Sequence, residues 1–93
     1  MYDQNNIFAK IINKEIACEV VYEDEKVIFF KDINPQAKTH ILCVPKKDVL
    51  NFNEFVMHSD KDFVVHFFNK ISEITKKLGL DQSGFRLITN NGK

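Results

Sequence analysis

The stretch Phe29–Lys47, FFKDINPQAKTHILCVPKK, decides how the rest of the sequence is interpreted. It begins at the end of one apolar run, passes through a loop around Pro35, and enters a second apolar run that stops at Pro45. A residue that precedes proline is kept out of helical geometry, so the middle of the stretch is predicted to be a loop. We therefore expect two strands joined by a loop that holds polar side chains at the rim of a sheet, where binding groups concentrate.

The second of these strands is predicted over Thr39–Val44. Side chains alternate along a strand, so His40 and Leu42 fall on one face and Cys43 on the other. A zinc site built from His40 and Cys43 is therefore not expected. On the amino-terminal side, two runs rich in β-branched and aromatic residues flank a polar turn, which predicts a β-hairpin over residues 20–31.

Helical periodicity appears in two places. Apolar residues at helical spacing predict a short amphipathic helix over residues 6–13 and a long one over about 60–78. A capping motif at Ser59–Asp62 precedes the long helix, and Gly79 is suited to the position after its end. Residues 48–58 fit either a short helix or an ordered loop.

The run Phe85–Thr89 is predicted to be a fourth strand, and it is followed by Asn90-Asn91-Gly92. Asn-Gly is a strong hairpin signal because a type I′ turn needs positive φ at both central residues. Only Lys93 follows this turn, so we expect that the architecture continues beyond it. The elements together predict an α+β class.

Composition limits the function classes. The 93 residues are 44% hydrophobic with nine Phe, which is enough for the core of a single domain over residues 1–93. Thirteen basic and thirteen acidic side chains cancel without long runs of one sign, so neither nucleic acid nor a membrane is an expected partner. No signal peptide or membrane span is recognisable, and a cytoplasmic protein is expected. Cys18 and Cys43 do not have the spacing of a metal-binding or redox motif, and a disulfide between them is the alternative.

Each polar candidate residue has a functional and a structural interpretation. His40 suits contact with a phosphate or a catalytic group, but the residue alone favours a partly buried strand histidine. Asp32 fits an acceptor for sugar hydroxyls and a turn-forming aspartate equally well. Phe30 and Ile33 suit a base sandwich or, more commonly, a core. Asn90 suits contact with a phosphate, but the hairpin turn is preferred.

Three segments, IFAKIINKEI, VVYEDEKVIFFKDINPQAKTHILCVPKK and GFRLITNNG, closely resemble the histidine triad (HIT) superfamily in its branch of small nucleotide-binding, phosphoramidase-like proteins. The resemblance runs from about residue 6 to residue 93 and is most specific in the segment DINPQA-x-x-HIL-x-x-PKK. It implies a meandering antiparallel sheet with one long helix packed against it and a short amino-terminal helix. It also implies a homodimer that pairs through the long helix and the neighbouring strand.

The same resemblance implies a site for a purine nucleoside monophosphate or a related nucleotide. Asp32 would hold the ribose hydroxyls, Asn90 would approach the α-phosphate, and His40 would orient the catalytic histidine from behind. The residues implied to line or adjoin the base pocket are Ile7, Phe8, Ile11, Phe30, Ile33 and Leu42.

The sequence departs from the family at the motif that gives the family its name. In the family, a His-x-His-x-His strand follows the NNG turn, and its middle histidine forms a nucleotidyl-histidine intermediate that water resolves. The 93 residues contain no His-x-His-x-His motif. We therefore expect a chain truncated before this motif, with weak or no catalysis. The alternatives are a non-catalytic nucleotide-binding or dimerising module and a shortened piece of an active enzyme.

Zinc is also not expected from the resemblance, and no other cofactor is implied. Asn6 and Ala9 stand where zinc-binding members have cysteines, and Asp48 replaces a histidine common after the PKK run.

Overall fold

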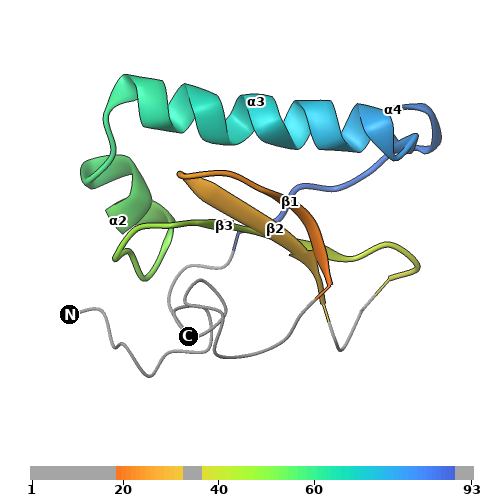
Figure 1. The fold of residues 1–93 in the computed structure, drawn as a ribbon, viewed down its shortest axis with the longest axis horizontal. Coiled ribbons are helices and arrows are strands. Elements are labelled where there is room, and N and C mark those ends of the chain that lie inside the picture. Colours follow the sequence, from red (N-terminus) through yellow and green to blue (C-terminus); the bar gives the residue numbers. More distant parts are fainter. Residues whose placement is uncertain (1–18, 33–36, 90–93) are drawn as a thin grey trace. The chain divides into compact units, whose positions relative to one another are not determined.

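The computed structural model describes residues 19–32 and 37–89, which belong to two units, residues 1–48 with the sheet and residues 49–93 with the helices. Three antiparallel strands form the sheet in the order β1-β2-β3 (Figure 1): β1 (Val20–Glu23), β2 (Val27–Lys31) and β3 (Ile41–Pro45). The hairpin predicted over residues 20–31 is confirmed. The strand predicted from Thr39 is also confirmed, although it begins at Ile41.

The central strand β2 is the most buried part of the sheet unit. Val27, Ile28 and Phe29 are 0% exposed, and Phe30 is 3% exposed. Ile28 and Phe30 pack on one face with residues of β3, Leu42 and Val44, which confirms the alternation predicted for that strand. Burying each such side chain stabilises a fold by about 1.5–3 kcal/mol, so β2 is the main contributor of core to this unit.

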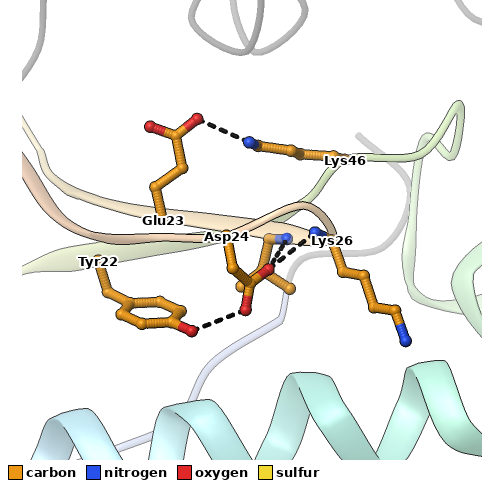
Figure 2. Close-up of polar contacts among 6 residues, drawn as sticks. Tyr22, Glu23, Asp24, Lys26 and Lys46 are labelled. Carbon is orange, nitrogen blue, oxygen red and sulfur yellow. Dashed lines mark hydrogen bonds and ion pairs between the residues drawn. The ribbon is translucent and has the colours of Figure 1, made fainter.

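Asp24 organises the turn between β1 and β2 (Figure 2). Its Oδ1 accepts hydrogen bonds from the backbone N–H groups of Lys26 at 2.7 Å and Val27 at 2.9 Å, and its Oδ2 accepts one from the Tyr22 hydroxyl at 2.7 Å. Aspartate favours turns because its side chain can bond the backbone two residues on, as it does here. The polar turn predicted between the two strands is therefore locked by one carboxylate.

An ion pair joins the same end of the sheet across all three strands (Figure 2). Lys46 Nζ lies 2.6 Å from Glu23 Oε2, and both side chains are largely buried. The backbone N–H of Lys46 donates to the carbonyl of Lys26 at 2.8 Å and so extends the β2–β3 ladder by one step. This contact connects the ends of β1 and β3, which are not neighbours in the sheet.

The helical unit contains α2 (Phe52–Met57), α3 (Lys61–Lys77) and α4 (Leu80–Ser83). Asn51 caps α2 by accepting from the backbone N–H of Glu54 at 2.9 Å, and Asp60 caps α3 by accepting from that of Phe63 at 2.8 Å. Such caps satisfy N–H groups that have no partner within the helix. The helix predicted over about 60–78 is confirmed, and of the two possibilities left for residues 48–58 the short helix is correct.

Gly79 ends α3 as predicted, with φ +76°. Glycine adopts this left-handed conformation without the steric cost that other residues incur. Phe55, 6% exposed, lies between α3 aromatics, with ring centroids 6.0 Å from Phe63 and 5.0 Å from Phe67. These contacts connect α2 to α3 and form the aromatic core of the helical unit.

The prediction of a fourth strand over Phe85–Thr89 is wrong for this structure, because residues 84–89 form neither helix nor strand. The run is rich in residues that suit a pleated surface, but a strand also needs a partner for its backbone groups. Phe85, Leu87 and Ile88 are more than half exposed. The sheet therefore contains three strands within the described residues instead of four.

The molecule is an α+β protein. The helix predicted over residues 6–13 lies outside the described residues, and the single domain over 1–93 stays a prediction. Among the helices of the described segments, none is long and apolar enough to cross a membrane.

Candidate functional site

The pair Asp32 and His40 extends the β2–β3 register one step beyond both strands. Within the ladder, Phe30 faces Leu42 and Lys31 faces Ile41, so the next opposed positions are 32 and 40. The backbone N–H of Asp32 donates to the carbonyl oxygen of His40 at 3.0 Å. This bond holds the two residues opposite each other at the mouth of the loop.

The two side chains also meet. His40 Nε2 lies 3.5 Å from Asp32 Oδ2, and the side chains are 29% and 21% exposed. This separation is long for a hydrogen bond between nitrogen and oxygen, but it is within the range of an ion pair when the imidazole is protonated. The structure thus places a carboxylate and an imidazole in contact, half-buried at the end of the sheet.

Apolar side chains adjoin this pair on the same face. Residues two apart on a strand share a face, so Phe30 precedes Asp32, and Leu42 follows His40, on the face of the Ile28 cluster. Phe30 is almost fully buried, whereas Leu42 is half-buried. The arrangement is a polar pair at the edge of an apolar wall, which is the usual composition of a small-molecule site.

A second ion pair lies next to the site. Lys31 Nζ is 2.8 Å from Glu19 Oε2, and the backbone N–H of Lys31 donates to the Glu19 carbonyl at 3.0 Å. Both side chains are more than half exposed, so this pair contributes little to stability. Neither this pair nor the Glu23–Lys46 pair was predicted from the sequence, because both depend on the register of the strands.

Cys43, on β3, is a free thiol, and burial raises its pKa to about 12. A thiol with a raised pKa is a poor nucleophile and a poor metal ligand at neutral pH, because the thiolate is the reactive form. In residues 19–32 and 37–89, no group of three or more His, Cys, Asp or Glu side chains is arranged to hold a metal ion.

Comparison with known proteins identifies the family. Residues 5–90 match the family model described as the scavenger mRNA decapping enzyme C-terminal binding domain. The chain is also 44% identical over 93 residues to a HIT-like protein of Rickettsia prowazekii, covering all of this chain and 78% of that one. The chain belongs to the histidine triad (HIT) superfamily.

Solved structures of other HIT proteins share the fold. A histidine triad protein from Clostridium difficile superimposes with a TM-score of 0.85 at 44% identity, covering 100% of this chain and 80% of that one. A HIT family hydrolase from Clostridium thermocellum gives a TM-score of 0.82 at 35% identity, covering 97% of this chain and 77% of that one.

A further relative was found by sequence. A 14 kDa zinc-binding protein of Zea mays is 44% identical over 91 residues, covering 97% of this HIT chain and 70% of the maize protein.

Four of the site residues predicted from the sequence lie within the described residues of this HIT chain. Phe30 and Leu42 pack in one apolar cluster, and Asp32 and His40 are in contact. The role predicted for His40, orienting a catalytic histidine, is untested, whereas its contact with Asp32 was not predicted. The remaining predicted site residues lie outside the described residues: Ile7, Phe8, Ile11, Ile33 and Asn90.

Proposed function

We propose that this HIT protein binds a purine nucleoside monophosphate or a related nucleotide, and that Asp32 holds its ribose. The observation that supports this most strongly is the position of the Asp32–His40 pair at the end of an apolar strand face. A carboxylate accepts hydrogen bonds from sugar hydroxyls, which is how acidic side chains commonly bind ribose. The proposal agrees with the HIT family hydrolases among the structural neighbours.

In this proposal the base lies against the apolar wall. Phe30 is 3% exposed, so it would form the back of the pocket and not an open stacking surface. Leu42 is more exposed and would contact the ligand directly. The other side chains proposed to line the base pocket are Ile7, Phe8, Ile11 and Ile33, with Asn90 near the α-phosphate.

We also propose that these residues bind a nucleotide without hydrolysing it at a significant rate. They contain three histidines, His40, His58 and His66, and none belongs to a His-x-His-x-His motif. His40 is held beside Asp32, and a nucleophile misplaced by about 1 Å already costs roughly 100-fold in rate. Release of nucleotide from an aminoacyl- or lysyl-phosphoramidate by the purified chain would contradict this part of the proposal.

Titration calorimetry with adenosine and guanosine monophosphates tests the binding. We expect saturable binding by the wild-type chain that Asp32→Asn weakens by about ten- to a hundredfold, the worth of hydrogen bonds to a charged group. Glu25→Gln is the matched control, because it removes the same charge from an exposed site at the opposite end of β2. Equal affinity of wild type and Asp32→Asn would contradict the proposal.

A second candidate function is a homodimer or an interaction module, and exposed apolar residues in the helical unit favour it. Val65 and Phe68 of α3 are 56% and 40% exposed, and Ile88 is 68% exposed. Sedimentation equilibrium tests this function: we expect a dimer that Ile88→Lys dissociates, whereas Ser72→Lys, at an exposed position of α3, leaves it intact. A monomeric wild-type chain would contradict it.

A further inference from the structure

We propose that His40 is a positioning residue for Asp32, which it holds ready to accept hydrogen bonds from a vicinal diol, and that it thereby favours ribonucleotides over 2′-deoxyribonucleotides. This inference rests on the proposed function and gives His40 a role on the sugar side of the site. It starts from the contact of 3.5 Å between His40 Nε2 and Asp32 Oδ2.

The contact favours a proton on the imidazole nitrogen that faces the carboxylate. A carboxylate has only acceptor atoms, so the nitrogen that faces it must bear a proton. In the neutral ring this gives the Nε2–H tautomer and leaves Nδ1 as the acceptor. An Nδ1–H tautomer would direct the lone pair of Nε2 at the lone pairs of Asp32, which is repulsive. The geometry therefore favours the Nε2–H tautomer of the neutral His40 ring.

The same contact limits the orientation of the Asp32 carboxylate. The backbone bond of 3.0 Å from Asp32 N–H to the His40 carbonyl fixes the two main chains, so the imidazole acts on a carboxylate already held at its Cα. An ionised carboxylate accepts about four hydrogen bonds, so a carboxylate that contacts an imidazole can also accept from a hydroxyl. Two adjacent hydroxyls can then bind in one defined orientation, without the entropy cost of ordering a free side chain.

Other charged side chains near the pair do not replace His40 in this role. Lys31 directly precedes Asp32, so the two side chains point to opposite faces of the sheet. Lys31 is also paired with Glu19 at 2.8 Å. Lys38 precedes His40 by two residues and is exposed. The contact of 3.5 Å that bears on the Asp32 carboxylate comes from His40.

Two variants that each keep an N–H donor at the position of one ring nitrogen of His40 test the inference. His40→Gln keeps an N–H donor at the position of Nε2, whereas His40→Asn keeps one at the position of Nδ1 only. Calorimetry with adenosine monophosphate and its 2′-deoxy analogue should give a preference of about tenfold or more for the ribonucleotide in wild type and His40→Gln. In His40→Asn the ratio should fall to about one.

A merely structural role for His40 would weaken both nucleotides equally and leave the ratio unchanged, and that result would overturn the inference. Adenosine monophosphate binding that is absent in wild type would overturn the proposed function itself, so the two failures are distinguishable. Nitrogen-15 NMR of the imidazole gives a second readout that needs no variant. Protonated Nε2 in the neutral ring is expected, and protonated Nδ1 would overturn the inference.

Discussion

The two ends of the central strand β2 both carry an aspartate, but the two carboxylates are held differently. At the turn end, Asp24 accepts three hydrogen bonds of 2.7–2.9 Å from its own hairpin. At the loop end, Asp32 makes an imidazole contact of 3.5 Å. The first arrangement maximises the contribution of a carboxylate to folding. The second places a partly exposed carboxylate beside an imidazole at the end of the sheet, so the difference separates a structural aspartate from a candidate binding one.

The largest predicted effect is on the reactivity of Cys43, which lies on β3 between the two ends of the sheet. Its thiol serves as a buried reference for the two aspartates. With the pKa of Cys43 raised from 9.0 to about 12 by burial, the thiolate fraction at pH 8 falls about a thousandfold. We expect Cys43 to react with a disulfide reagent about a thousandfold more slowly in the folded chain than in denaturant, measured by absorbance in a Cys18→Ser background. Equal reaction rates in the folded chain and in denaturant would show that the Cys43 thiol is accessible to the reagent in the folded sheet.

The raised pKa also predicts a loss of stability at high pH. The unfolded thiol ionises near its ordinary pKa while the folded thiol stays protonated, so protons are released on unfolding. The contribution is therefore complete below about pH 9 and falls as the pH rises towards about 12. Denaturant titrations at pH 8 and pH 10 should show a smaller loss for Cys43→Val than for wild type. An identical loss would contradict the buried position.

Substitution at the turn end should have the next largest effect. Asp24→Ala removes three hydrogen bonds, two of them to backbone N–H groups, and is expected to lower the free energy of unfolding by about 2 kcal/mol. Asp24→Asn keeps one side-chain oxygen and should cost less than half as much. Urea titration measures both, and neither change should alter nucleotide affinity by more than about twofold. A large loss of affinity would mean that the turn end belongs to the binding site.

The ion pair at the same end should contribute less. Lys46→Met keeps the aliphatic stem but removes the charge that faces Glu23 at 2.6 Å. We expect a loss of about 1 kcal/mol in the free energy of unfolding, because the pair is largely buried but not isolated from solvent. Lys26→Met, at an exposed position in the same turn, is the control and should be neutral.

The smallest effect on stability is expected at the loop end. Asp32→Asn should change the free energy of unfolding by no more than about 0.5 kcal/mol, because the contact that it alters is long and partly exposed to solvent. Urea titration of the same protein used for calorimetry measures this. A loss comparable to that of Asp24→Ala would assign Asp32 a structural role and remove the distinction between the two ends.

Local signals predicted most of the fold. Apolar periodicity located α3, and the positive φ of Gly79 followed from residue type and position, whereas the N-cap is Asp60 and not Ser59, at which the predicted capping motif begins. Alternation placed Leu42 on the face of the core. These features depend on residues close in sequence, so the sequence alone was sufficient to predict them.

Features that depend on pairing were less predictable. The run Phe85–Thr89 has strand propensity but forms no strand, because propensity does not supply a partner. The contact between His40 and Asp32 depends on the register of two strands separated by a loop, and that register is set by packing and turn geometry. The sequence identified both residues as candidates, but only the structure brings them together.

A nitrogen-15 correlated NMR titration with adenosine monophosphate tests the central claim most directly, because it reports on both ends of β2 at once. The account predicts that the largest shifts occur at the amides of Asp32, His40 and Leu42, whereas those of Asp24 and Lys46 remain within the noise. Shifts concentrated at Asp24 and Lys46, or none at any of these amides under saturating nucleotide, would contradict it.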